Sequence, residues 1–220
     1  MTENRTAALV LAGGQARRMD FGDQPASGRG GGQPVLTPNS DKPLLTVGGR
    51  TMLAAVIAAL DVPHIAISAN GDPARFAVFG LPVLSDGAFQ GQGPLAGILA
   101  GLEWAASLGM TALLTAPGDM PFLPRGLANR LAPPPGCVSS QGRRHHLVAL
   151  WPTNRATRLR DLLSIPGSRQ VAYFSERIGM RYVEFAVPTG DPFANVNTRD
   201  DLTRARASAG EDHGRELGKS

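Results

Sequence analysis

Short apolar runs that alternate with helix-like segments constrain the fold of this 220-residue sequence more than any other feature. Buried strands are predicted at 7–12, 64–70, 81–86 and 111–121, with further candidates at 145–151 and 180–187. Helices are predicted over 51–60, 93–109, 155–164, 168–178 and 199–208, the first with Thr51 as its N-cap. This alternation predicts an α/β fold: a mostly parallel sheet with helices on both faces.

Two polar segments set the expected domain limits. Residues 1–208 are predicted to form a single domain. Within it, residues 20–40 are rich in Gly, Pro, Ser and Gln and are expected to be a flexible insertion. Residues 209–220 are polar and are expected to be a disordered tail.

Composition excludes several classes of protein. The one cysteine, Cys137, rules out an internal disulfide or a multi-cysteine metal site, so we expect a buried, inert thiol. A net charge of +4 suits an anionic ligand, but the arginines are too scattered for a nucleic-acid stripe. No apolar leader or membrane-length run is apparent, so we expect a cytoplasmic protein with no membrane partner.

Polar or glycine residues follow the predicted strands at the points where they end. These are Gly13-Gly14, Asn70, Asp86 and Asp119. Ligands of parallel sheets bind at the carboxyl ends of the strands. The sequence therefore predicts a binding site at this edge.

The stretch "LVLAGGQARRM" (9–19) is typical of a phosphate-binding turn. Glycines after a strand let backbone N–H groups approach a nucleotide, and Arg17 and Arg18 suit a polyphosphate. Lys42, held before Pro43, adds a point charge. Each feature also fits an ordinary turn or a solvated surface, and neither the dinucleotide fingerprint nor the P-loop motif is present.

Two further motifs offer polar ligands. Asp119 in "PGDMP" is rigidly presented after a buried strand and is the best candidate for a metal, since Mg²⁺ is commonly held by one or two carboxylates plus substrate phosphates. Asn195 and Asn197 are two apart, so in an extended segment both amides lie on one side. Turn formation by Asp119 and capping at Thr198 would explain part of these patterns without a ligand.

Nucleophilic and zinc chemistry are not supported. His145 and His146 are adjacent in a predicted strand and face opposite ways, so both cannot bind one ion; we expect one to face the site and the other solvent. No G-x-S-x-G elbow occurs.

Taken in order, "LAGGQARRM", "DKPLL", "GPLAGILAGL", "PGDMPF" and "FANVNTRDDL" resemble the molybdenum cofactor guanylyltransferase family, over about residues 8–202. The resemblance implies a Rossmann-like nucleotidyltransferase fold. It also implies an enzyme that transfers GMP from GTP to molybdopterin, or to its molybdenum-loaded form, and releases pyrophosphate. Proteins that deliver the cofactor or accept it would be further partners.

The resemblance also implies residue roles. Leu11, Ala12 and Gly13 would contact the nucleotide through backbone, and Lys42, Asn70 and Asp86 would bind GTP. Asp119 would bind both nucleotide and Mg²⁺, Arg18 would lie by the phosphates, and Asn195 and Asn197 would face the pterin. Arg18, Lys42 and Asp119 form the expected catalytic set.

The sequence departs from the family pattern in three places. The segment between Met19 and Asp41 is much longer than usual, Leu147 stands where a proline commonly follows the family's His, and the residues flanking Asp119 differ. His146 is therefore a weak site candidate. A cytidylyltransferase acting on molybdopterin, or a non-catalytic cofactor-binding chaperone, remains an alternative.

Overall fold

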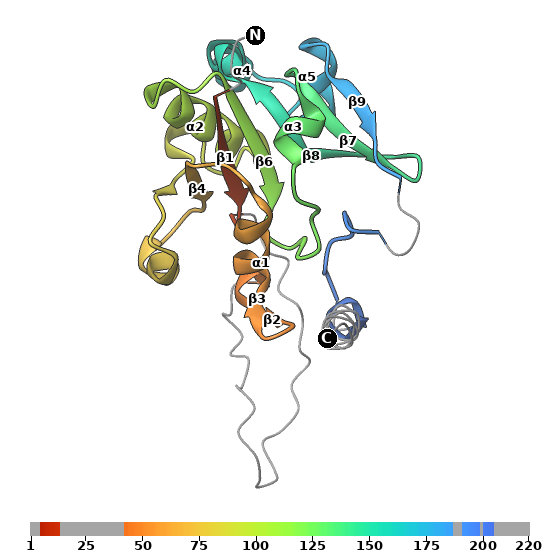
Figure 1. The fold of residues 1–220 in the computed structure, drawn as a ribbon. Coiled ribbons are helices and arrows are strands. Elements are labelled where there is room, and N and C mark those ends of the chain that lie inside the picture. Colours follow the sequence, from red (N-terminus) through yellow and green to blue (C-terminus); the bar gives the residue numbers. More distant parts are fainter. Residues whose placement is uncertain (1–4, 14–41, 187–190, 199, 205–220) are drawn as a thin grey trace, which may run out of the picture.

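The computed structural model describes residues 5–13, 42–186, 191–198 and 200–204, and a seven-stranded sheet dominates them (Figure 1). The strand order is β5-β4-β1-β6-β8-β7-β9. The strands are β1 (Thr6–Leu11), β4 (Ile65–Ser68), β5 (Val83–Leu84), β6 (Ala112–Pro117), β7 (Gly136–Ser140), β8 (Arg143–Pro152) and β9 (Arg181–Glu184). Only the two pairings of β8, with β6 and β7, are antiparallel within this sheet. The prediction of a mostly parallel sheet is confirmed.

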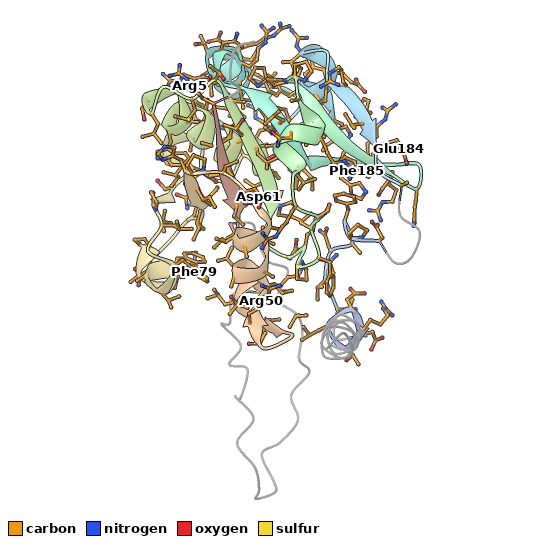
Figure 2. The ribbon with its side chains drawn as sticks, viewed as in Figure 1. Arg5, Arg50, Asp61, Phe79, Glu184 and Phe185 are labelled. Carbon is orange, nitrogen blue, oxygen red and sulfur yellow. The ribbon has the colours of Figure 1, made fainter. Side chains whose placement is uncertain are left out.

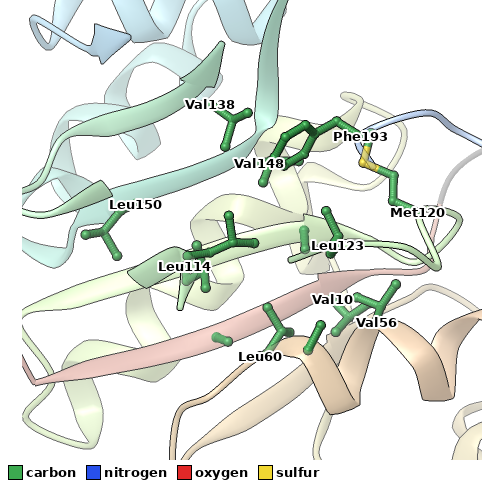
Figure 3. Packing of buried hydrophobic residues seen from close by; sticks show 14 of the residues in the cluster. Val10, Val56, Leu60, Leu114, Met120, Leu123, Val138, Val148, Leu150 and Phe193 are labelled. Carbon is green, nitrogen blue, oxygen red and sulfur yellow. The ribbon is translucent and has the colours of Figure 1, made fainter. Parts of the chain in front are cut away.

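Helices cover both faces of the sheet, as predicted. One layer contains α1 (Met52–Ala59) and α3 (Leu127–Leu131), and the other contains α2 (Pro94–Ser107), α4 (Ala156–Ser164) and α5 (Val171–Arg177). Strand β1 divides its side chains between them: Val10 joins the core with α1 (Figure 3), and Leu9 joins the core with α2. Short 3-10 helices lie in the connections between these elements: η1 (Lys42–Leu44), η2 (Pro73–Phe79), η3 (Gly87–Phe89) and η4 (Thr153–Arg155).

The predicted elements are present, with shorter bounds at several ends. Thr51 caps α1, since its hydroxyl accepts a hydrogen bond from Ala54 N at 3.1 Å. Of the last predicted helix, 199–208, residues 200–204 are helical and the rest lies outside the described residues, as do 20–40 and 209–220. No helix among the described residues is long and apolar enough to cross a membrane.

Besides the 3-10 helices, the strand β7, the helix α3 and the short strands β2 (Thr46–Val47) and β3 (Arg50–Thr51), which pair as a hairpin, were not predicted. The β2–β3 hairpin closes through Gly48-Gly49, with φ of 57° and 79°. Strands β7 and β8 form a second hairpin, which closes through Gln141-Gly142, with φ of 48° and 74°. Two left-handed residues make the turn that matches strand twist. Strand β7 also pairs in parallel with β9, so it joins the edge strand to the sheet.

Helix α2 packs very closely on the sheet through two glycines. A Cβ on Gly101 would lie 2.6 Å from Leu9 Cδ2 and 2.9 Å from Leu113 Cδ2. A Cβ on Gly97 would collide with the Ser68 hydroxyl at the end of β4. The glycines of "GPLAGILAGL" therefore set how near the first turns of α2 come to the carboxyl edge of the sheet.

The segment 191–198 is anchored to the core by Phe193. Its ring lies 5.2 Å from the His145 ring and 5.3 Å from the Phe185 ring, centroid to centroid. Figure 2 shows Phe185 at the end of β9, and Figure 3 shows Phe193 beside Met120. Further along, Val196 and Leu202 pack with Leu45, Val47 and Met52 in a separate cluster. Val196 and Leu202 are thereby held beside the η1 region.

The single thiol is buried, as expected. Cys137 in β7 is 0% exposed, and burial raises the pKa of its thiol to about 12. A thiol with so high a pKa is not a nucleophile at neutral pH.

Gly97→Ala is expected to lower the free energy of unfolding, by about 1–3 kcal/mol, because the new methyl meets the Ser68 side chain. Alanine has a higher helix propensity than glycine, so any loss of stability in this variant comes from the clash. Ser68→Ala in the same chain should restore most of the loss. Denaturant unfolding of both single variants and the double variant measures this, and an unchanged stability of Gly97→Ala would contradict the close packing.

Acidification is expected to destabilise the protein through the adjacent histidines His145 and His146. Burial is the first cause that lowers the pKa of both His145 and His146 from 6.5. Below pH 6.5 the unfolded chain therefore binds more protons than the folded one, and stability falls as pH drops from there toward the lowered pKa values.

Melting temperature as a function of pH tests this. His145→Gln should flatten the decline, because one of the two groups no longer titrates. A variant whose melting temperature falls as steeply as that of the wild type would show that His145 does not contribute.

Candidate functional site

The candidate site lies at the edge of the sheet where β1, β4, β5 and β6 all end. These four strands are parallel, so their carboxyl ends meet there, at the lower edge of the sheet in Figure 1. Each predicted strand-end residue follows its strand: Gly13 after β1, Asn70 after β4, Asp86 after β5 and Asp119 after β6. The predicted meeting of these residues at one edge is confirmed.

The backbone at Leu11–Gly13 is held by its neighbours. Ala12 N and Gly13 N donate hydrogen bonds to Ser68 O at 2.9 and 2.8 Å, and Leu11 O accepts one from Gly118 N at 3.0 Å. A side chain at Gly13 would not fit, since its Cβ would lie 2.9 Å from Ala69 Cα. Glycine at this position is therefore a steric requirement.

These bonds change what the turn can offer a ligand. The expectation was that its N–H groups would approach phosphate, but the N–H groups of Ala12 and Gly13 are engaged by Ser68 O. What these two residues can present is carbonyl oxygens, which accept hydrogen bonds from N–H donors rather than from phosphate oxygens. Gly14, Arg17 and Arg18 lie outside the described residues.

Lys42 brings three distant segments together. Its Nζ donates to Asp119 Oδ2 at 2.5 Å and to Asn197 Oδ1 at 2.5 Å. The Lys42 and Asp119 side chains are 16% and 18% exposed, so the pair is partly open to solvent. The sequence predicted all three residues, and the structure places them in one cluster.

Local packing explains how Lys42 reaches Asp119. Gly118 has no side chain, and a Cβ there would lie 3.3 Å from Pro43 Cβ and 3.4 Å from Leu53 Cδ1. Pro43 is buried, so η1 sits against the strand end that Asp119 follows. On the other side, Val196 N donates to Asp119 O at 3.0 Å and brings Asn197 alongside.

Asn70 and Asp86 form a second polar pair. Asn70 Nδ2 donates to Asp86 Oδ2 at 2.7 Å, and Asp86 N donates to Asn70 Oδ1 at 3.0 Å. Asp86 Oδ1 points toward the start of α2, where a Cβ on Gly97 would lie 3.4 Å from it. The pair thus uses one carboxylate oxygen internally and leaves the other beside α2.

The two clusters lie on opposite sides of β1. Strand β4 leads to Asn70 and β6 leads to Asp119, and both pair with β1. Neighbouring strands are about 4.8 Å apart, so the ends of β4 and β6 are separated by roughly 10 Å. The β4 side holds the Asn70–Asp86 pair, with Arg75 Nη2 donating to Asn70 O, and the β6 side holds Lys42, so the two halves of the edge carry different polar groups.

The remaining predictions concern the two asparagines and the two histidines. Asn195 and Asn197 are both exposed with buried Val196 between them, consistent with amides on one side of an extended segment. The histidines face opposite ways, as predicted, and His146 is half-buried rather than fully exposed to solvent. His145 is 7% exposed under Phe193 and bonds to Ser140 Oγ at 2.8 Å, while His146 packs edge-on against Tyr182.

The fit of a magnesium ion rests on Asp119. Among the described residues no group of three or more His, Cys, Asp or Glu side chains could hold a metal. One carboxylate suits Mg²⁺ only if waters and substrate phosphates supply the remaining ligands. Within the same described part of the chain, Asp119 Oδ1 has no hydrogen-bond partner, so this oxygen is available.

Residue-by-residue reasoning missed three groups that build the site. Ser68 holds the glycine turn through its carbonyl, Gly97 admits the Ser68 and Asp86 side chains, and Phe193 anchors the segment of Asn197. A glycine inside a helical pattern was a usable signal for close approach at Gly97. Nothing local marks Ser68 or Phe193.

Comparison with known proteins agrees with this geometry. A family model described as a MobA-like NTP transferase domain matches residues 8–178. The molybdenum cofactor guanylyltransferase of Acidiphilium cryptum is 49% identical over 202 residues, which cover 91% of this chain and 93% of the relative. That of Mesorhizobium japonicum is 45% identical, covering 90% and 93%.

Solved structures share the fold. Molybdopterin-guanine dinucleotide biosynthesis protein A from Archaeoglobus fulgidus has a TM-score of 0.64 at 19% identity, over 94% of this chain and 99% of that one. A nucleotidyl transferase from Methanothermobacter thermautotrophicus has a TM-score of 0.65 at 21% identity, over 96% and 100%. The predicted Rossmann-like nucleotidyltransferase fold is confirmed. Because the family model spans most of the chain and the relatives align along nearly all of it, this chain belongs to the MobA-like NTP transferase family.

Proposed function

We propose that this protein transfers GMP from GTP to the phosphate of molybdopterin, or of its molybdenum-loaded form, and releases pyrophosphate. The names of its relatives support the substrates. The observation that carries the proposal is the cluster of Lys42, Asp119 and Asn197, assembled at the carboxyl edge of the sheet.

The chemistry needs no protein nucleophile. A phosphate oxygen of molybdopterin attacks the α-phosphorus of GTP, a new P–O bond forms, and the bond to pyrophosphate breaks. Two anions must be brought together and the charge on the leaving pyrophosphate stabilised. Lys42 supplies a fixed cation for this, and Asp119 and Asn197 orient it.

The two halves of the edge suit the two ends of GTP. The carbonyls of Ala12 and Gly13, with Asn70 and Asp86, would take the nucleoside end. Guanine offers N–H donors, and carbonyl and carboxylate oxygens accept them. Lys42 and Asp119 would take the phosphate end, with Arg18 as a second cation, and Asn195 and Asn197 would face the pterin.

Mg²⁺ is the proposed cofactor, held by Asp119 together with substrate phosphates. When bound, the ion would neutralise phosphate charge and help to orient the phosphates. Lys42 Nζ contacts Oδ2 of Asp119, so the ion would be held by the other oxygen, Oδ1.

Two other functions compete. A cytidylyltransferase would use the same fold and the same phosphate end, and it differs only at the nucleoside end. A cofactor-binding chaperone would need binding groups but no cation placed at the phosphates, so the Lys42–Asp119 pair favours an enzyme.

Pyrophosphate release by the purified protein with Mg²⁺ and molybdopterin, compared for GTP and CTP, tests the function. We expect release with GTP and little with CTP, because guanine offers two neighbouring donors, N1–H and N2–H2, to a carboxylate such as Asp86, whereas cytosine offers its N4 amino group alone. Release with CTP would change the base assignment. Release with neither nucleotide would favour the chaperone.

Asp119→Asn is expected to lower turnover by roughly 10²-fold or more, because the neutral amide forms no ion pair with Lys42 and binds a cation more weakly than a carboxylate does. Asp161→Asn, an exposed carboxylate of α4, is the matched control and should leave turnover unchanged. Turnover titrated against Mg²⁺ measures both effects. Full Mg²⁺-dependent activity in Asp119→Asn would contradict the assignment.

A further inference from the structure

One guanidinium group, that of Arg169, links two separate parts of the protein. Its Nη1 and Nη2 donate to Leu162 O (3.0 Å), Leu163 O (3.1 Å) and Ile165 O (2.7 Å), the carbonyls at the end of α4. Its Nε donates to Gln92 Oε1 at 2.6 Å. Arg169 lies in the linker between α4 and α5, so it ties this linker to the loop that precedes α2.

That loop, Asp86–Gln92, begins with a residue of the proposed nucleoside end. We call it the base loop. Gly87 and Gly91 within it, and Gly93 after it, have φ of 54°, 84° and 78°. Glycines in such conformations permit many backbone states, so the loop needs outside contacts to hold one shape.

Hydrogen bonds transmit the position of Gln92 back to Asp86. Gln92 N donates to Phe89 O at 3.1 Å, and Phe89 N donates to Asp86 O at 3.0 Å. These two consecutive turns form a continuous chain of hydrogen bonds through the loop. Arg169 contacts one end of this chain, and the Asp86–Asn70 pair lies at the other.

We propose that Arg169 is a positioning residue for nucleotide binding: through Gln92 it fixes the base loop and hence the place of the Asp86 carboxylate. This inference rests on the proposed function. It assigns the linker between α4 and α5, which contains no predicted site residue, a part in the affinity for GTP.

Gln92→Ala separates positioning from stability. It removes the loop contact of Arg169 and leaves the three carbonyl contacts at the end of α4 in place. The KM for GTP should rise roughly 3- to 10-fold, as for one lost hydrogen bond. The kcat and the KM for molybdopterin should stay unchanged, because the phosphate end is untouched.

Gln92→Glu is the rescue variant, since a carboxylate can accept from the same Nε more strongly. Its KM for GTP should lie close to the wild-type value. Arg160→Ala is the matched control. Arg160 also joins α4 to α2, through Glu103 at 2.6 Å, but it does not touch the base loop, so its KM for GTP should not change.

Three results would overturn the inference: an unchanged KM for GTP in Gln92→Ala, a Gln92→Glu variant as impaired as Gln92→Ala, or an equal rise in Arg160→Ala. Calorimetric titration with GTP measures nucleotide binding separately from GMP transfer. If the wild type binds GTP but releases no pyrophosphate, the proposed GMP transfer is contradicted and the role of Arg169 in GTP binding is not. Weaker GTP binding by Gln92→Ala than by that wild type would then support the tether, and equal binding would refute it.

Discussion

The contact between Lys42 and two oxygens, from Asp119 and Asn197, is the interaction on which the functional edge depends. It joins segments 77 and 155 residues apart in the sequence. A partly exposed ion pair of this kind adds little to stability, so its value is geometric. Gly118 lets η1 approach, and the contacts of the Phe193 ring with His145 and Phe185 hold the segment 191–198 in place. Packing in the core therefore places Lys42 and its two partners together at the carboxyl end of β6.

Close packing sets the other half of the edge. Ser68 engages the backbone N–H groups of Ala12 and Gly13, and Gly97 lets α2 come down onto Ser68 and Asp86. The result is the Asn70–Asp86 pair beside β4 and the Lys42 cation beside β6, at strand ends roughly 10 Å apart. The carboxylate of Asp86 can accept hydrogen bonds from a base, and the Lys42 ammonium can contact negatively charged phosphates.

Much of the fold could be predicted because apolar periodicity is a local signal. Buried runs such as 7–12 and 111–121 have few alternatives to a parallel strand, and Thr51 marks a helix start. Strand β7 was missed because Gly136–Ser140 lacks a long apolar run, although Gln141-Gly142 was a weak hairpin signal. The partial burial of His146 was not predicted because Tyr182, which packs edge-on against it, comes from a strand 36 positions later in the sequence.

The sequence by itself determined the α/β alternation, the strand ends that carry polar groups, and the residues Lys42, Asn70, Asp86, Asp119 and Asn197 as the set to examine. Only the tertiary structure decided how they divide into two clusters, because strand order places β1 between β4 and β6. It also decided that the described N–H groups of the glycine turn are engaged by Ser68, and that Arg169 reaches Gln92. Hydrogen bonds between segments far apart in the chain depend on packing, and packing leaves no pattern in any single stretch of sequence.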